Sequence, residues 1–459
     1  MKRNPVKVSV YIILGVLYLF MASILLRIVT KNILVEQLGI SNRVTQFILS
    51  GMSTMDAVDE VTGELYNKVD WNSLYPFDNQ TETATQAVSE QNSKIGQIYN
   101  QYTQKIVQIK NVVNDYCNEY LVGRVPFIEK AYSYEKLIQW SLIPANSNNG
   151  IIRKDDGYLT YVSGKIDTSD MANHLSDLNE FVKEKNIPLL YIQAPSKIDP
   201  DDADLPAGVS DYTNENIDQL LSQLDQNKVK YLDLRDYIKQ NFAVYEDAFY
   251  KTDHHWKTTT AFGAVGELVK CLNSEFDFQI DDDFLQPDRY TIQTYEKYFL
   301  GSQGKKVTLA VAQPEDYQLV VPDFETRFSI QIPERNIDIS GDFADTLLDY
   351  RHLQTIDYYN ENCYASFMNR NDAYAQITNL GNGNIAEKKI LFIKDSYSTP
   401  FIPYLAIGVR QIDTIYELLF TGSIQTYIEE TRPDLVIVMY SSSSMSENVE
   451  SHSAFYNLQ

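Results

Sequence analysis

Two short stretches of this sequence carry the residue types of a nucleophilic active site. Lys251–Lys257 reads KTDHHWK, and Ile390–Thr399 reads ILFIKDSYST, an apolar run that ends in Asp-Ser. A serine hydroxyl is a weak nucleophile until a base takes its proton, and the base needs a carboxylate to orient it. The two stretches contain all three kinds of residue, and Ser396, His255 and Asp253 are the candidates, with His254 the weaker choice of base. The sequence therefore predicts a Ser–His–Asp site where the two stretches meet.

The local spacing supports this prediction. Asp253 and His255 are two positions apart, so in an extended stretch their side chains face the same way. The carboxylate could then hold one nitrogen of the imidazole while the other nitrogen addresses Ser396. A serine at a strand-to-helix turn lifts its hydroxyl into a cleft, and the helix that follows offers a positive dipole and free amides.

Simpler explanations exist for both stretches. An Asp-Ser pair after a strand is often a helix N-cap, and Asp253 could cap a helix that begins after Trp256. However, the chain has only five histidines, and two of them are adjacent here. A metal site is a further alternative, but adjacent histidines are expected to point apart, and no HxxxH or HxH partner appears. We therefore expect neither a metal nor another cofactor.

Composition narrows the class of protein. The chain has 459 residues, 44% of them apolar and 22% charged, which is typical of a globular protein. The formal net charge of −23 argues against nucleic acid as a partner, because phosphate binding needs a basic surface. The 33 tyrosines suit polar grooves such as carbohydrate sites, although tyrosine also packs well in sheets.

The N-terminal segment predicts a membrane anchor. Val8–Leu26 carries no charge, and a helix of this length spans about 28 Å, roughly the thickness of the hydrocarbon layer. Basic residues precede it, which favours a cytoplasmic N-terminus. A cleaved signal peptide is the alternative, but no A-x-A-like site follows. We expect residues 1–27 to form a cytoplasmic tip and a single transmembrane helix, with the bulk of the chain extracellular.

The remainder divides into two parts. Residues 28–150 predict a helical stem, with a heptad pattern between Tyr99 and Tyr120. Residues 151–459 predict an α/β domain, because apolar strand patterns alternate with helical ones, and such units form a mostly parallel sheet flanked by helices. Residues 276–385 interrupt this alternation of strand and helix patterns, and they predict a mixed or antiparallel insertion. Strands are expected at Ile187–Pro195, Val229–Leu234, Lys388–Asp395, Arg410–Ile415 and Asp434–Tyr440.

Five motifs together carry a resemblance to a known family. They are TDHHW, KDSYS, APSK (Ala194–Lys197), YFLGSQGKK (Tyr298–Lys306) and PDFET (Pro322–Thr326). These resemble the DHHW family of bacterial surface proteins, which is similar to the alginate O-acetyltransferase-like branch of the SGNH hydrolases. In that branch the Asp-x-His element precedes the serine, as it does here. The resemblance implies an SGNH-like fold with Ser396 as nucleophile, His255 as base and Asp253 as orienting acid.

The oxyanion hole departs from the family pattern. Ordinary SGNH enzymes use a Gly and an Asn whose places fall near Tyr416 and Ser441 here, and neither residue matches. The Ser396 N–H is the best candidate donor, with Tyr397 and Ser441 as weaker ones. Lys197, in a loop after the first strand, could contact substrate or could be an exposed lysine in a turn.

The resemblance implies O-acyl, in particular acetyl, transfer onto a cell-surface polysaccharide, or its removal, through an acyl-serine. It further implies a multi-pass membrane acyltransferase of the MBOAT type as a partner. A non-catalytic glycan-binding or assembly protein on a degenerate SGNH scaffold is the alternative from a different class, and a metal-dependent hydrolase is a third. The residues leave the glycan, the acyl donor and the choice between transferase and esterase open.

Overall fold

The computed structural model describes residues 151–445, apart from positions 155, 202, 207 and 417, together with the single residues 125, 455 and 458. The chain divides into two units, Met1–Glu135 and Lys136–Gln459, and the fold described below belongs to the second. The predicted anchor, and the predicted stem apart from residue 125, lie outside the described residues and stay predictions. Within the described part of the chain, no helix is long and apolar enough to cross a membrane.

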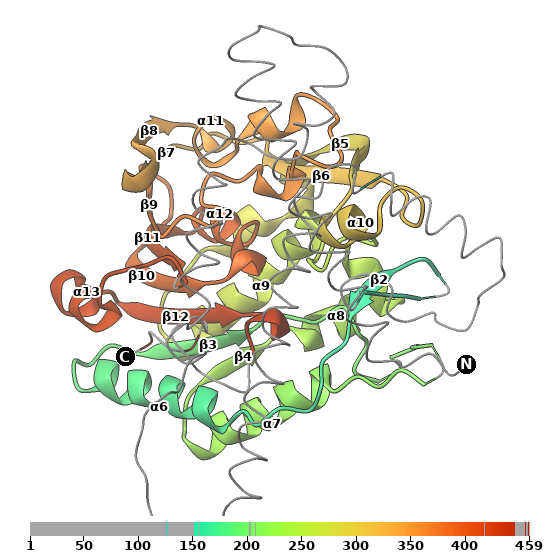
Figure 1. Cartoon of the computed structure of the whole chain (residues 1–459). Helices are drawn as coiled ribbons and strands as arrows, with labels where there is room; N and C mark the ends of the chain where they lie inside the picture. Colours follow the sequence, from blue (N-terminus) through green and yellow to red (C-terminus); the bar gives the residue numbers. More distant parts are fainter. Residues whose placement is uncertain are drawn as a thin grey trace, which may run out of the picture. The chain divides into compact units, whose positions relative to one another are not determined.

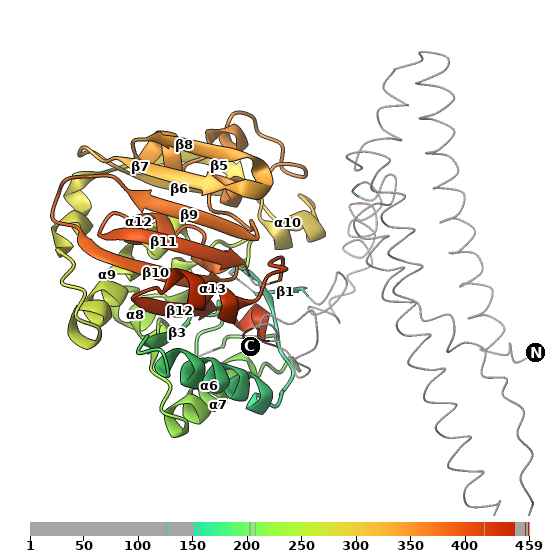
Figure 2. The same cartoon turned by 90° about the vertical axis from the view of Figure 1, so that its left-hand side faces the viewer.

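An eight-stranded mixed sheet forms the centre of the domain, in the order β4-β3-β12-β10-β11-β9-β7-β8. The five strands from β4 to β11 are parallel, and the remaining three pair antiparallel. Figure 2 shows these strands one below the other, from β8 and β7 down to β12 and β3. The parallel strands are β3 (Leu189–Gln193), β4 (Tyr231–Asp233), β10 (Ala386–Lys394), β11 (Val409–Tyr416) and β12 (Leu435–Tyr440). The antiparallel strands are β7 (Phe328–Ile332), β8 (Ile337–Gly341) and β9 (Tyr374–Asn379).

Helices cover both faces of the sheet (Figure 1). In β10, Ile390 and Phe392 belong to the core on one face, and Leu391 and Ile393 belong to the core on the other. Burial on both faces explains why this strand reads as an uninterrupted apolar run. One core is completed by α8 (Arg235–Asn241), α9 (Thr258–Glu275) and α12 (Ile402–Leu405), and the other by α6 (Ser169–Lys183), α7 (Thr213–Gln226) and α13 (Ile424–Thr431). The predicted α/β fold with helices on both faces is confirmed.

The segment 276–385 adds antiparallel structure. Its strands β7, β8 and β9 continue the central sheet, and β5 (Tyr290–Phe299) and β6 (Glu315–Pro322) form a separate hairpin. The central sheet therefore contains more antiparallel strands than the alternation of strand and helix patterns predicted. Smaller elements are β1 (Ile151–Arg153), β2 (Leu159–Tyr161), α10 (Ser302–Val307) and α11 (Phe343–Leu347). Short 3-10 turns are η3 (Tyr245–Ala248), η4 (Asp282–Leu285), η5 (Pro287–Arg289), η6 (Pro333–Arg335), η7 (Tyr350–Leu353), η8 (Cys363–Ala365), η9 (Ser396–Ser398) and η10 (Ser442–Ser444).

Strand register brings three loops to one edge of the sheet. In the parallel ladders, Lys394 of β10 lies beside Met439 of β12, and Tyr440 of β12 lies beside Gln193 of β3. The loops that follow these three strands therefore leave the sheet at the same carboxyl edge, where ligands of α/β proteins usually bind.

Candidate active site

Ser396 stands at the carboxyl end of β10, as the first residue of η9. The Asp395 carboxylate caps this turn by accepting a hydrogen bond from the Tyr397 N–H at 2.9 Å. Beyond η9, α12 begins only at Ile402 and is four residues long. The helix predicted near Phe401 is therefore present but short, and η9 separates its first residue from the serine.

The segment that carries Asp253 and His255 is a tight loop. Its ends are joined by an antiparallel bridge between Phe249 and Trp256, and the residues between 251 and 255 form successive bends. The Asp253 carboxylate accepts a hydrogen bond at 3.0 Å from the N–H of His255, two residues later, which closes an Asx turn. The two side chains thus meet because of a turn and not because of the extended conformation that the spacing suggested.

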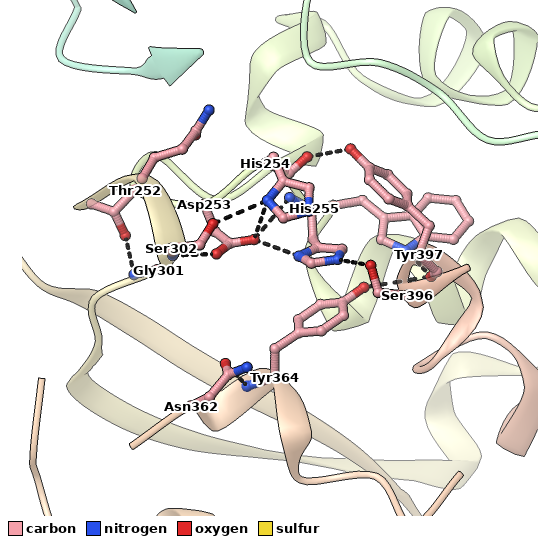
Figure 3. A network of polar contacts seen from close by, with 12 residues as sticks. Thr252, Asp253, His254, His255, Gly301, Ser302, Asn362, Tyr364, Ser396 and Tyr397 are labelled. Atoms are coloured by element: carbon pink, nitrogen blue, oxygen red, sulfur yellow. Dashed lines mark hydrogen bonds and ion pairs between the residues drawn. The ribbon is translucent and has the colours of Figure 1, made fainter. Parts of the chain in front are cut away.

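The structure brings Ser396, His255 and Asp253 into one chain of hydrogen bonds. Nε2 of His255 lies 2.8 Å from the Ser396 hydroxyl, and its Nδ1 lies 2.5 Å from Oδ1 of Asp253. Figure 3 shows this chain, with the imidazole between the hydroxyl and the carboxylate. Asp253 and His255 are buried and Ser396 is partly exposed, so the hydroxyl is the end of the chain that a substrate could reach. Such distances permit proton transfer from the serine to the imidazole.

A second segment supports the Asp253 carboxylate. Its Oδ2 accepts a hydrogen bond of 2.6 Å from the N–H of Ser302. Burial opposes ionisation of this carboxyl, but the imidazoles of His255 and His254 and the hydrogen bonds from His255 and Ser302 hold its pKa well below the usual range. A Cβ atom on Gly301 would lie 2.2 Å from Cβ of Asp253, so only glycine fits at that position. The sequence singled out the YFLGSQGKK motif but did not assign it this role.

The two adjacent histidines do not point apart as predicted. The bends in the loop bring the ring centroids of His254 and His255 to 3.8 Å, and Nδ1 of His254 lies 3.0 Å from the Ser302 hydroxyl. Burial and the neighbouring His255 lower the pKa of His254 to about 3, so this ring is neutral at physiological pH. Ligand atoms of Asp253, His254 and His255 lie within 4.8 Å of one another, close enough for a metal ion. A metal there would replace the 2.5 Å contact between Asp253 and His255.

Aromatic side chains surround the base. The Tyr364 ring stacks on the His255 ring with centroids 4.0 Å apart and an interplanar angle of 19°. The indole N–H of Trp256 donates to the carbonyl of Tyr397 at 2.9 Å, which ties the histidine loop to the serine turn. Sequence reasoning missed Tyr364, because nothing in the local pattern distinguishes it among 33 tyrosines. Trp256, by contrast, belongs to the TDHHW motif.

Tyr397 and Ser441, the weaker oxyanion candidates, bind within the protein. Their N–H groups donate to the Asp395 carboxylate at 2.9 and 2.7 Å, and the Ser441 hydroxyl donates to it as well. The Tyr397 hydroxyl donates to the carbonyl of His254. Among the main-chain hydrogen bonds of the described turns and loops, none has the Ser396 N–H as donor, so this group remains the candidate oxyanion donor. Tyr416, the other place inferred for an oxyanion donor, ends β11.

A cavity of about 290 Å³ is lined by His254 and Tyr397, the chain neighbours of His255 and Ser396. Lys197 also lines this cavity, but its ammonium donates to main-chain carbonyls, among them that of Asp253 at 2.6 Å. Most other lining residues carry hydroxyl groups, which suits a ligand with many hydrogen-bonding groups. These residues are Thr160, Tyr161, Ser163, Ser196, Thr213, Ser442 and Ser443.

Comparison with known families confirms the resemblance predicted from the motifs. Residues 154–325 match the family model described as "SGNH hydrolase-like domain, acetyltransferase AlgX". This range includes Asp253 and His255 and ends before Ser396. Comparison with curated protein sequences gives no match.

Solved structures share this fold. Bacillus cereus PatB1 is 20% identical, with a TM-score of 0.54, over 66% of this chain and 98% of that chain. A structure of PatB1 with a sulfonyl adduct has a TM-score of 0.55 at 20% identity, over 68% and 99% of the two chains. A DHHW family protein from Eubacterium siraeum is 18% identical, with a TM-score of 0.52, over 69% and 97%. At such identities the likeness establishes a common fold.

Proposed function

We propose that this chain is a membrane-anchored, extracellular Ser–His–Asp enzyme that transfers acyl groups, in particular acetyl, to a cell-surface polysaccharide or removes them. The observation that carries the proposal is the unbroken hydrogen-bond chain from the Ser396 hydroxyl through His255 to Asp253. The match to an acetyltransferase domain model supports the acyl chemistry.

The reaction proceeds in two half-reactions. Nε2 of His255 takes the proton of Ser396 while Oγ attacks the acyl carbonyl, and the carbonyl oxygen becomes an oxyanion that the Ser396 N–H stabilises. Collapse of this intermediate breaks the bond to the leaving group, which receives the proton from His255, and leaves an acyl-serine. His255 then deprotonates an incoming hydroxyl, whose oxygen attacks the acyl-serine. The bond between the acyl carbon and Oγ of Ser396 breaks, and Oγ takes back the proton from His255, which regenerates the enzyme. A sugar hydroxyl gives transfer, and water gives hydrolysis.

Asp253 keeps the base in the working orientation. The carboxylate stays ionised, accepts the Nδ1–H of His255 and stabilises the imidazolium that forms when the serine loses its proton. Oδ2 is held separately by the N–H of Ser302, so both carboxylate oxygens have fixed partners.

Three further observations bear on substrate and location. The hydroxyl-lined cavity beside the site supports an acceptor with many hydroxyl groups. The uncharged segment Val8–Leu26 and the basic residues before it support a single-pass anchor with an extracellular domain. An acidic chain of net charge −23 supports a neutral or polar glycan over nucleic acid. A multi-pass acyltransferase of the MBOAT type would supply the acyl groups from inside the cell.

Labelling with a serine-directed fluorophosphonate or sulfonyl fluoride tests the proposal on the detergent-purified full chain. We expect one covalent adduct, which is lost in Ser396→Ala and retained in Ser274→Ala, an exposed serine near the end of α9. Labelling that survives addition of a chelator would separate this enzyme from a metal-dependent hydrolase. A folded wild-type chain that is never labelled would instead support the non-catalytic glycan-binding alternative.

A further inference from the structure

Two charged side chains form hydrogen bonds with the main chain just before His255, one with its carbonyls and the other with its N–H groups. The Lys197 ammonium donates to the carbonyls of Lys251 at 3.1 Å and of Asp253 at 2.6 Å. The Glu315 carboxylate accepts from the N–H groups of Lys251 and Thr252 at 2.8 and 2.7 Å. Lysine thus takes the carbonyls of this segment, and glutamate takes its amides.

These contacts take the place of the main-chain hydrogen bonds that a helix or strand would form. Residues 251–255 belong to no helix or strand, yet buried main-chain groups need partners. The ammonium of Lys197 also donates to the carbonyl of Leu159 in β2 at 2.6 Å. Glu315 opens strand β6 and additionally accepts from the Thr252 hydroxyl at 2.6 Å. The two side chains therefore tie the histidine loop to two separate parts of the fold.

From these contacts we propose that Lys197 and Glu315 are positioning residues, a backbone clamp that sets the place of Asp253 and His255 for proton transfer. The inference rests on the proposed function for its catalytic meaning, but the clamp is defined by its own contacts. It replaces the substrate contact considered for Lys197 from the sequence, because three carbonyls match the three hydrogens of the ammonium.

Removing charged side chains from water costs folding free energy unless hydrogen bonds satisfy them. Lys197 is only 5% exposed, and burial lowers its pKa to about 7 while the nearby Glu315 and Asp253 oppose that shift. Burial raises the pKa of Glu315, although its hydrogen bonds from Thr252 and Lys251 act against this. Buried charges persist where hydrogen bonds satisfy them. Lys197 is such a buried charge, and the partly exposed Glu315 lies on the same three residues of the loop.

The clamp connects to the support of the carboxylate. The hydroxyl of Thr252, held by Glu315, accepts from the N–H of Gly301 at 2.9 Å. The carbonyl of Thr252 accepts from the N–H of Gly304 at 2.8 Å. Since the Ser302 N–H between these positions binds Asp253, a shift of Thr252 would move both sides of the Asp253 site together.

The test compares Lys197→Met and Glu315→Gln with the wild-type chain, by hydrolysis of p-nitrophenyl acetate and by the rate of fluorophosphonate labelling. We expect kcat and the labelling rate to fall about 100-fold with KM nearly unchanged, because a displaced base slows chemistry more than binding. The matched control is Lys154→Met, a buried lysine whose ammonium pairs with Glu246 and Asp204. This variant should keep the wild-type rate.

Three outcomes overturn the clamp. A rise in KM at unchanged kcat assigns Lys197 to substrate binding, and unchanged kinetics in both variants removes the positioning role. If the fold-losses in rate of the two single variants multiply in the double variant, the two side chains do not act on one loop. Should Lys197→Met fail to fold, Glu315→Gln carries the test, because it preserves the side-chain shape.

Amide hydrogen exchange keeps this inference separate from the proposed function. We expect faster exchange at Lys251 and Thr252 in Glu315→Gln than in the wild type, with the exchange of β10 unchanged. If the wild-type chain never reacts with the probe, the enzymatic proposal fails while the exchange result still decides the clamp. If the wild type reacts and the variants react equally fast, the clamp fails alone.

Discussion

The two halves of the candidate site are built in different ways. Ser396 follows β10, a strand held on both sides by parallel neighbours, so the ladders to β11 and β12 determine where the serine lies. Asp253 and His255 lie on a loop of bends whose place depends on side-chain contacts to the main chain. Many redundant bonds position the nucleophile, and a few individual bonds position the base. The loop half should therefore respond to single substitutions more strongly than the sheet half.

The two halves meet through a small number of contacts. The indole of Trp256 donates to the carbonyl of Tyr397, and the hydroxyl of Tyr397 donates to the carbonyl of His254. These bonds join both chain neighbours of the base, Trp256 and His254, to Tyr397, the residue after the nucleophile. The site can thus keep the 2.8 Å contact between His255 and Ser396 although its two halves belong to different elements.

The largest effect is expected from Asp253→Asn on the loop side. An amide nitrogen facing Nδ1 of His255 favours the wrong tautomer, and kcat should fall on the order of 10³- to 10⁴-fold, as for other triads of this type. Ester hydrolysis by the purified full chain measures this effect. The exposed Asp288 gives the matched control, Asp288→Asn, which should retain the wild-type rate. A loss smaller than about tenfold would mean that His255 does not depend on this carboxylate.

Gly301→Ala should come next. The new Cβ would lie 2.2 Å from Cβ of Asp253, so the carboxylate must move, and we expect the labelling rate of Ser396 to fall about 100-fold. Gly383→Ala is the control, because its Cβ meets nothing within 4 Å. Equal labelling rates in the two variants would show that the loop tolerates displacement.

On the sheet side, Asp395→Asn should have a smaller effect on rate. Asp395 accepts from the N–H groups of Tyr397 and Ser441 and from the hydroxyls of Ser441 and Ser444. The amide loses some of these acceptors, so we expect destabilisation by about 1–3 kcal/mol, measured by denaturant unfolding. Because the ladders of β10 remain, the rate should drop by only about tenfold. A drop as large as that of Asp253→Asn would contradict the contrast between the two halves.

The smallest effect concerns acid stability. His254 is neutral in the folded chain because burial and His255 lower its pKa to about 3, whereas a histidine in the unfolded chain takes a proton near pH 6.5. The unfolded state therefore binds more protons between these values, and stability falls as the pH falls through that range. His254→Gln removes this dependence. When the pH falls from 7 to 5, the unfolding free energy of this variant should decrease by about 1–2 kcal/mol less than that of the wild type. Parallel stability curves for the two chains would contradict the neutral state of this ring.

Much of the fold followed from local patterns. The five parallel strands were predicted close to their observed places. The clearest signals are those of β3 and β12, which are buried throughout, and of the apolar second half of β10. The edge strand β4 is short and has no fully buried residue. The antiparallel strands β7 to β9 were predicted only as part of a mixed or antiparallel insertion, since their joining to the central sheet depends on the pairing of β9 with β11. The helix expected near Phe401 is present as the short α12.

In the candidate site, too, local patterns predicted some features and contacts between distant segments decided the others. Asp253, His255 and Ser396 could be selected from residue types, order and motif resemblance. The stacking of Tyr364 on His255, the Ser302 N–H on Asp253 and the grip of Glu315 on Thr252 could not. Each of these contacts joins residues that are far apart in the chain, and the composition around either partner carries no mark of the other.

Residue order alone predicted the five parallel strands and the candidate residues Asp253, His255 and Ser396, since burial and turn preferences act over a few neighbouring positions. The geometry of the base, including the close approach of His254 to His255 and the internal use of the Lys197 ammonium, arose from packing between distant segments. Those interactions exist only once the sheet has brought its loops to one edge, because hydrogen bonds of 2.5 to 3.0 Å require placement that no local preference supplies.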